Sequence, residues 1–287
     1  IVGEDHFWVE LMAGVVRVRL VFIVIFGGIT RIADVASRVV PAMVILYMSL
    51  ALWVILANLE TVPHYLALIV TDAFSGDAVA GGVVGLVIVT GVRRAAFSNE
   101  AGIGTESMAH GAAKTKEPTR EGLVAMMEPV IDTLIVCTCT ALVILMTGVW
   151  QTTSDNGVTL TANAFESAMP GFGSYLLIVC VVFFSTSTIF TYSYYGTKCL
   201  GFLIGAERQH WYNYFYVGCI VLASVASLDA AVSLIDGMFA LMAIPTMVST
   251  LLLAPRVMRS LRDYIARFHP PHGTMDETRA HEVKETN

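Results

Sequence analysis

Charged residues are scarce in this sequence. Only 14% of its 287 residues are charged and 56% are hydrophobic, whereas soluble domains carry about 25% charged residues. So few charges cannot cover the surface of a soluble body of this length. The chain also has no basic stripe that could neutralise phosphates, so nucleic acid is not expected as a partner. We therefore expect an integral membrane protein that is surrounded by membrane lipid.

Cysteine pairs and strict two-residue alternation are also missing. The five cysteines lie in or beside apolar runs, and the spacing of Cys137 and Cys139 is wrong for a C-x-x-C redox pair. We interpret them as reduced thiols that pack as small hydrophobic side chains. Membrane-spanning β-barrels need alternation with a period of two residues, which leaves α-helices as the spanning elements. The expected fold class is therefore all-α.

Seven apolar runs are each close to the length of about 20 residues that a helix needs to cross about 30 Å of hydrocarbon. Pro41 is expected to open the second run. We predict a multi-span transmembrane helical bundle over residues 1–264 and a polar, mobile tail over 265–287. The runs cover residues 11–29, 40–59, 78–97, 122–150, 173–204, 211–228 and 230–257.

Lysine and arginine are unevenly distributed between these runs. The loops 58–77 and 151–170 contain neither residue. The positive-inside rule places loops rich in lysine and arginine in the cytoplasm, which predicts a multi-pass protein of the cell membrane with a cytoplasmic C-terminus. The basic side chains in question are Arg31, Arg38, Lys114, Lys116, Arg120, Lys198, Arg208, Arg256, Arg259, Arg262 and Arg267.

A glycine-rich segment follows the third run. Its sequence N-E-A-G-I-G contains Gly102 and Gly104, which lower helix propensity and relax the backbone. We predict a break between two half-helices over residues 98–105, where freed carbonyls could bind a cation and a helix N-terminus could face a carboxylate. The alternative is a cytoplasmic loop, because Lys114 and Lys116 follow closely.

A second polar concentration lies inside the fifth run. Five hydroxyl residues occur within the seven positions 185–191. Hydroxyl oxygens suit a small, hard cation, but serine and threonine in membrane helices also often bond to a carbonyl of their own helix. Both interpretations stay open at this point.

Ionisable groups inside the spans are few. Asp132 lies near the start of the fourth run, where we expect it to point inward to a hydroxyl, amide or cationic partner. Asp236 allows the same interpretation. His64 and His110 have no acid or nucleophile at a meaningful spacing, so no catalytic role is assigned to them.

Several long motifs resemble the alanine or glycine:cation symporter family. They occur in the family's order and extend over most of the chain: F-G-G-I-T-R-I-A at 26–33, R-R-A-A-F-S-N-E-A-G-I-G-T-E-S-M-A-H-G-A-A-K-T at 93–115, I-D-T-L-I-V-C-T at 131–138 and S-T-I-F-T-Y-S-Y-Y-G-T-K-C at 187–199. The resemblance implies a leucine-transporter-like fold of inverted repeats, in which sodium and an amino acid bind where two core helices break.

The resemblance also implies roles for individual residues. The second break, and with it contact to the substrate, falls on Gly102, Ile103, Gly104 and Thr105. Thr188 and Tyr192 contribute to the substrate site from the facing helix, and Ser187 and Thr188 supply oxygens to sodium, with Ser185 and Thr186 as the fallback pair. The family commonly has Trp at the position of Tyr192 and small residues where this chain has Glu106.

The function that follows is sodium-coupled symport of a small neutral amino acid, of the alanine or glycine type, by alternating access. The chain starts at Ile1, so we expect it to be N-terminally truncated and to need the missing N-terminal half of the same transporter, which carries the family's other broken helix. The alternatives are a truncated remnant that does not transport and a membrane-embedded enzyme. No nucleophile–base pair or metal-ligand spacing favours the enzyme.

Overall fold

The computed structural model describes residues 18–19, 21–73, 84–155, 157–224 and 227–268, and within these it is helical with no strand. The predicted tail beyond Phe268 and the start of the first and third runs lie outside the described residues. The elements are α2 (Gly28–Ala57), η1 (Leu59–Thr61), α3 (Val62–Ala73), α5 (Val84–Asn99), α6 (Thr105–His110), α7 (Pro118–Ala125), η2 (Val130–Cys137), α8 (Thr138–Thr147), η3 (Val149–Gln151), α9 (Gly157–Ala168), α10 (Gly173–Ile204), α11 (Trp211–Ser224) and α12 (Leu228–Phe268).

Four helices within the described residues are long and apolar enough to cross a membrane. They cover Thr30–Ala57, Pro118–Thr147, Gly173–Ile204 and Ala230–Phe268. The all-helical membrane class is therefore confirmed, and α10 has the bounds of the predicted run 173–204. The run predicted at 211–228 contains α11, which has only 14 residues. The count of seven spans stays a prediction.

Pro41 was wrongly placed at the start of a helix. It lies inside α2, which begins at Gly28. Proline removes one backbone donor, but membrane helices tolerate this because neighbouring groups satisfy the freed carbonyl. A turn at residues 26–27 precedes α2, close to the predicted end of the first run at Gly27 and Gly28. The predicted gap between the first two runs is wrong, because Arg31 and Arg38 lie inside α2.

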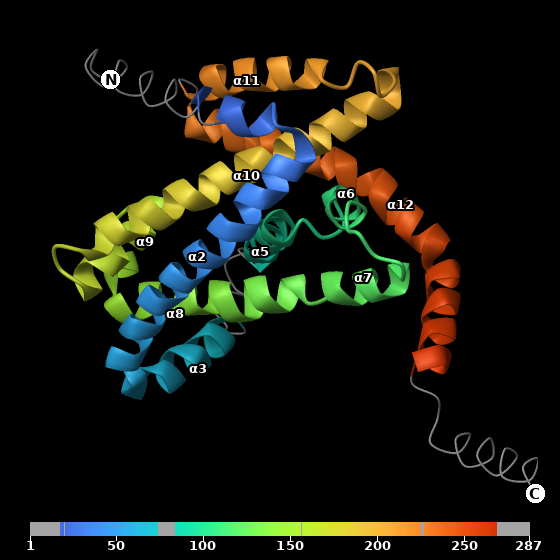
Figure 1. Cartoon of the computed structure of the whole chain (residues 1–287). Coiled ribbons are helices and arrows are strands. Elements are labelled where there is room, and N and C mark those ends of the chain that lie inside the picture. The colour runs from blue at the N-terminus through green and yellow to red at the C-terminus, as the bar shows by residue number, and fades with distance from the viewer. Residues whose placement is uncertain (1–17, 20, 74–83, 156, 225–226, 269–287) are drawn as a thin grey trace, which may run out of the picture. The chain divides into compact units, whose positions relative to one another are not determined.

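The described residues divide into two compact units, one from residues 1–99 and 129–236 and the other from residues 100–128 and 237–287. In the first unit α2 crosses α10, and α8 and α9 pack beside them (Figure 1). The core of these four helices includes Tyr47, Val54, Val143, Phe165 and Cys180, all buried. Tyr47 also shares a hydrogen bond with Thr140 of α8. The apolar faces of these helices thus meet one another.

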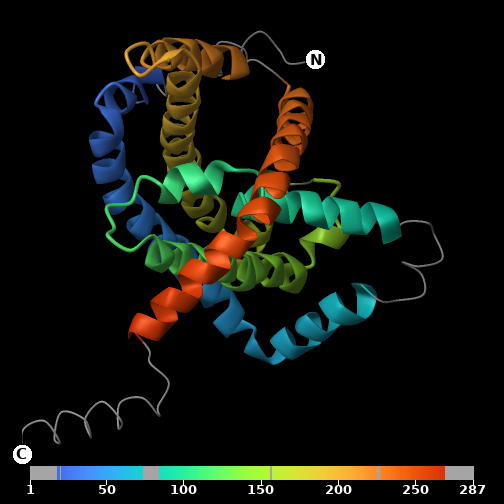
Figure 2. The ribbon, with the colours of Figure 1, turned by 90° about the vertical axis from the view of Figure 1, so that its right-hand side faces the viewer.

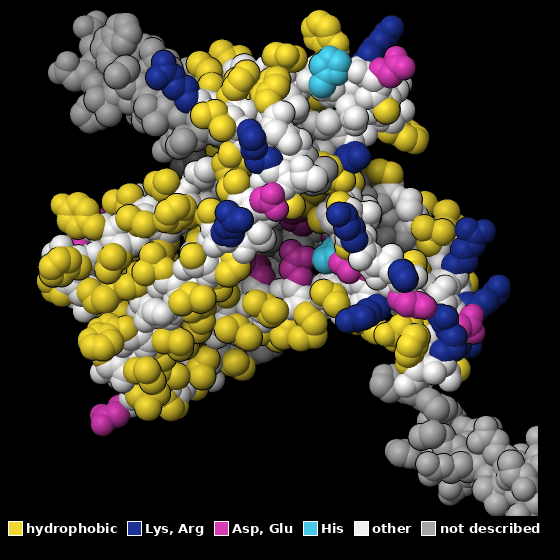
Figure 3. Space-filling model, viewed as in Figure 1, with side chains coloured by type: hydrophobic (Ala, Val, Ile, Leu, Met, Phe, Trp, Pro, Cys, Tyr) yellow, Lys and Arg dark blue, Asp and Glu magenta, His cyan; other side chains and the backbone are white. Residues whose placement is uncertain are grey.

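The outer surface of the first unit is also apolar. Hydrophobic side chains cover the visible faces of α2, α8 and α9 (Figure 3), and Trp53, Leu56 and Ile178 are among the exposed large side chains. A soluble protein rarely exposes contiguous apolar patches of more than a few hundred Å². This surface is that of a protein whose solvent is lipid.

Helix α11 turns back across the C-terminal end of α10 (Figures 1 and 2). Gly196 permits this contact, because a Cβ atom there would lie 1.9 Å from the ring of Tyr212. The hydroxyl of Tyr216 donates to the carbonyl of Ile189, at 3.0 Å. The second unit contains α6, α7 and residues 237–268 of α12, with α6 against α7.

The N-terminus of α10 is held by a carboxylate from the preceding helix α9. Glu166 accepts hydrogen bonds from the backbone N–H of Gly171 at 2.7 Å and from the hydroxyl and N–H of Ser174 at 2.7 and 3.1 Å. These bonds lower the pKa of Glu166 below its ordinary value, and the bond from the Gly171 N–H has the largest effect. The close α9–α10 corner also depends on Gly173, where a Cβ atom would lie 2.0 Å from the carbonyl oxygen of Phe165.

We expect Glu166→Gln to lower the melting temperature of the detergent-solubilised protein at pH 7 by a few degrees. Because the folded-state pKa is lowered, the ionised carboxylate stabilises the fold above its unfolded pKa of about 4.3, and this contribution disappears as the pH falls through the folded-state pKa. The gap between wild type and variant should therefore close below about pH 4. Glu207→Gln is the control, since that carboxylate makes no ion pair or hydrogen bond with a described residue. A gap that is constant with pH would contradict this assignment.

Candidate functional site

The predicted break in the backbone is present between α5 and α6. Helix α5 ends at Asn99 and α6 begins at Thr105. Between them Glu100, Gly102 and Gly104 have φ angles of 51°, 81° and 97°, a region that glycine enters without steric cost. A continuous helix through residues 98–105 is thereby excluded. The location of this break at membrane depth stays a prediction.

Within the break, Ile103 and Thr105 are buried. The hydroxyl oxygen of Thr105 has no hydrogen-bond partner in the described part of the chain. The neighbouring polar groups bond locally: the N–H of Gly104 donates to Glu106 at 2.8 Å, and the hydroxyl of Ser107 donates to the carbonyl of Gly104 at 2.8 Å. The carboxylate of Glu106 therefore holds the backbone of the break, and Thr105 presents an unused buried hydroxyl.

Thr246 of α12 lies directly against the break, and no motif in the sequence pointed to it. A Cβ atom on Gly104 would lie 2.7 Å from the hydroxyl oxygen of Thr246. That hydroxyl also donates to the carbonyl of Met242 at 2.9 Å. By contrast, a Cβ atom on Gly102 would meet no atom within 4 Å among the described residues. One glycine is closely packed and the other faces open space.

Asp132 has the hydroxyl and amide partners that were predicted for it. The hydroxyl of Ser98 donates to its carboxylate at 2.5 Å, and the amide of Asn99 lies 3.4 Å away. Asn99 and Thr133 are joined by two further bonds, at 2.7 and 3.0 Å. Asp132 and Thr133 lie in the π-helical segment η2, a rare winding that often marks functional sites. This network fixes the end of α5 just before the break.

The hydroxyl run of α10 bonds to its own helix. Ser187 and Thr188 both donate to the carbonyl of Phe184, at 2.9 and 3.0 Å, and Ser185 and Thr186 donate to the carbonyl of Val182. These are the bonds that the alternative interpretation predicted. They do not exclude a cation, because a hydroxyl that donates its proton keeps its lone pairs as acceptors.

The predicted site residues fall into both units. Gly102, Ile103, Gly104 and Thr105 belong to the second unit, and Ser187, Thr188 and Tyr192 to the first. The contact that the family resemblance implies between these two groups therefore stays a prediction. Within the first unit, the rings of Tyr192 and Tyr195 lie 5.5 Å apart.

His110 does have acidic neighbours, which corrects the expectation from its sequence spacing. Its Nδ1 lies 2.9 Å from Glu121 Oε1 and its Nε2 lies 3.6 Å from Glu128 Oε2. The chain turns back between α6 and α7, so residues 11 and 18 positions away in sequence reach the ring. A search limited to short spacings cannot find such a cluster.

Comparison with known proteins agrees with these features. The protein-family model described as the sodium:alanine symporter family matches residues 2–276. The sodium/alanine symporter AgcS of Methanococcus maripaludis is 35% identical over 85% of this chain and 54% of that protein. An uncharacterized transporter of Haemophilus influenzae is 35% identical over 93% of this chain and 60% of that protein. The probable sodium/glutamine symporter GlnT of Bacillus subtilis is 34% identical over 89% and 54%. The chain thus spans little more than half the length of these relatives.

We expect Gly104→Ala to destabilise the protein more than Gly102→Ala. Both replacements place alanine in a left-handed conformation, which costs about 1–2 kcal/mol. Only the methyl group at 104 also displaces the Thr246 hydroxyl from its bond to Met242, which adds about 1 kcal/mol. Thermal unfolding in detergent measures the difference in stability between the two variants. In a protein that already carries Thr246→Ala, adding Gly104→Ala should cost no more stability than adding Gly102→Ala, because the clash with the Thr246 hydroxyl is gone. Equal melting temperatures for the two glycine variants would show that the contact with Thr246 is unimportant.

Proposed function

The chain belongs to the sodium:alanine symporter family, and on this premise we propose that it forms part of a carrier that moves sodium and a small neutral amino acid together across the cell membrane. The cargo proposed is alanine or glycine, and the mechanism is alternating access in a leucine-transporter-like fold with a cytoplasmic C-terminus. Relatives named as alanine and glutamine symporters support an amino acid as cargo and sodium as the coupling cation.

The observation that carries the proposal is the buried hydroxyl of Thr105. A buried polar group without a partner costs about 1–3 kcal/mol, so one that is kept calls for a functional explanation. Its oxygen can donate to the carboxylate of an amino acid or accept from its ammonium group. The substrate would supply the bond that the protein lacks.

The backbone of the break supports the same role. Residues 100–104 lie outside α5 and α6, and the N–H of Ile103 reaches the Glu100 carbonyl only at 3.5 Å. Interrupted membrane helices use backbone groups outside the regular helical bonding pattern to bind ions and substrates. The open space beside Gly102 leaves room for a ligand to approach.

For sodium, we propose Ser187 and Thr188 of α10 as hydroxyl ligands. Their oxygens lie on adjacent residues, and both donate their protons to one carbonyl, which leaves lone pairs on two neighbouring oxygens for a hard cation. The remaining ligands would come from other parts of the transporter.

A membrane potential of about 100 mV contributes about 2.3 kcal/mol for each charge moved. That free energy equals an amino-acid gradient of about 50-fold.

No observation favours a membrane-embedded enzyme. Within the described residues no three His, Cys, Asp or Glu side chains are placed so that they could hold a metal ion, and symporters move their substrates without converting them. Nothing in the comparisons favours a remnant without activity. Uptake measurements on the complete gene product decide between these alternatives.

We expect proteoliposomes with the complete gene product to take up labelled alanine only with an inward sodium gradient, and Thr105→Val to raise the KM about tenfold. Valine keeps the shape of threonine but removes the hydroxyl that would bind the substrate, a loss of about 1.4 kcal/mol. The same change removes an unsatisfied buried group, so the substrate-free protein should be at least as stable as wild type.

Thr105→Ser, which keeps the hydroxyl, is the matched control and should retain a KM near that of wild type. A variant Thr105→Val that is less stable yet has an unchanged KM would assign this residue to packing. Uptake that is indifferent to the sodium gradient would overturn the proposed coupling.

For the cation, we expect Thr188→Val to raise the sodium concentration for half-maximal uptake several-fold without a matching loss of stability. The change removes one oxygen from the proposed ligand shell. Thr161→Val in α9 is the control, because Thr161 also donates to the carbonyl four residues earlier but lies outside the proposed site. An unchanged sodium response in Thr188→Val, or the same change in Thr161→Val, would eliminate Thr188 as a ligand.

A further inference from the structure

A groove of about 640 Å³ lies between α7 and the C-terminal part of α12 in the second unit. Its walls are mainly apolar. Leu123 of α7 and Met126 just after it line one side, and Val257 and Leu261 of α12 line the other. Arg256 and Ser260 line the same groove one helical turn apart. An apolar channel with a cationic and a hydroxyl group beside it matches an amphipathic anion.

The sequence of α12 places this groove at the depth of the lipid headgroups. Residues 237–255 carry no charged side chain, and at 1.5 Å per residue they extend about 28 Å, close to the thickness of the hydrocarbon layer. The basic side chains begin at Arg256, directly after this stretch. The groove residues from 256 to 267 therefore lie where the hydrocarbon ends and the phosphates begin.

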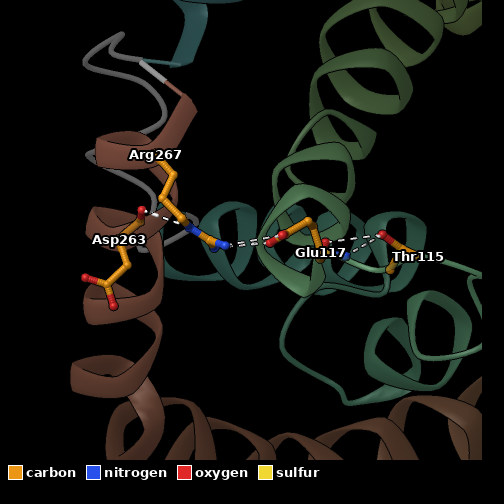
Figure 4. A network of polar contacts seen from close by, with 4 residues as sticks. All are labelled: Thr115, Glu117, Asp263 and Arg267. Carbon is orange, nitrogen blue, oxygen red and sulfur yellow. Dashed lines mark hydrogen bonds and ion pairs between the residues drawn. The ribbon is translucent and has the colours of Figure 1, made fainter. Parts of the chain in front are cut away.

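The arginine at the other end of the groove is already paired. The guanidinium of Arg267 donates to both carboxylate oxygens of Glu117, at 3.3 and 3.4 Å, and its Nε donates to the carbonyl of Asp263 (Figure 4). Arg256, in contrast, has no carboxylate within ion-pair distance among the described residues. Arg256 is thus the guanidinium of the groove without an ion pair among the described residues, while Asp263, which also lines the groove, bonds to Arg267 through its backbone carbonyl.

The surroundings of the groove are cationic. The two segments 114–120 and 256–267 together carry seven lysine and arginine side chains and two acidic ones, Glu117 and Asp263. Basic pockets beside membrane helices bind anionic headgroups. A neutral lipid would leave the charge of Arg256 without a partner, whereas an anionic phospholipid satisfies both the charge and the apolar walls.

We propose that this groove binds an anionic phospholipid of the surrounding bilayer. The phosphate lies at the Arg256 guanidinium and accepts from the Ser260 hydroxyl. An acyl chain extends along Leu123, Met126 and Leu261. The Glu117–Arg267 pair closes the far end of the groove, so the lipid contact is distinct from the helix break and does not depend on the proposed transport.

The test compares the thermal stabilisation of the detergent-solubilised complete gene product by phosphatidylglycerol, by phosphatidylcholine and by inorganic phosphate. We expect phosphatidylglycerol alone to raise the melting temperature. Arg256→Gln should weaken the apparent affinity for phosphatidylglycerol about fivefold, the change equivalent to about 1 kcal/mol for one basic side chain at an anionic surface. Arg256→Lys should keep most of it.

Arg259→Gln is the matched control, because it removes the same charge from the same helix outside the groove. Equal losses in Arg256→Gln and Arg259→Gln would show a general surface attraction and overturn the site. Equal stabilisation by phosphatidylglycerol and phosphatidylcholine would also overturn the proposal. That result is expected if another part of the protein fills the groove. Stabilisation by phosphate alone would identify a site for a free anion instead of a lipid.

Discussion

In a hydrocarbon layer, every polar group must find its partner within the protein, because no water is present to supply one. This constraint accounts for the helical architecture and for most of the polar contacts along the spans. The hydroxyls of α10 bond to their own helix, the Tyr47 hydroxyl reaches Thr140, and Asp132 is held by Ser98 and Asn99. Apolar side chains can then face lipid over the remaining surface, as Figure 3 shows for the first unit.

The segment between α5 and α6 departs from this rule. Its backbone leaves the helical conformation at three residues with positive φ, and the Thr105 hydroxyl is buried without a partner. Hydrogen bonds hold the helix ends on both sides of this segment. The Asn99–Thr133 bonds hold the end of α5, and Glu106 and Ser107 bond to the backbone of Gly104 at the start of α6. A buried hydroxyl without a partner beside well-held helix ends is an arrangement that suits a binding site.

The sequence predicted those parts of the structure that depend on local composition. Four of the apolar runs correspond to helices long enough to cross a membrane, α10 with the predicted bounds, and two closely spaced glycines predicted the break. The carboxylate of Asp132 was expected to find a partner because leaving it unpaired is costly. Contacts between segments that are distant in the sequence could not be predicted. The residues around Thr246 or His110 in the sequence do not indicate which helix packs against them. Pro41 was misplaced because proline both opens helices and occurs inside membrane helices.

The π-helical winding of η2 has a consequence for the helical wheel of its span. A π-turn closes five residues back instead of four, so it acts as a one-residue insertion in an otherwise α-helical rod. One residue corresponds to a rotation of about 100°. The side chains of α8 are therefore rotated by about this angle from the positions that an unbroken α-helix continued from Pro129 would give them. A single α-helical wheel drawn through residues 129–147 would assign many side chains of α8 to the wrong face.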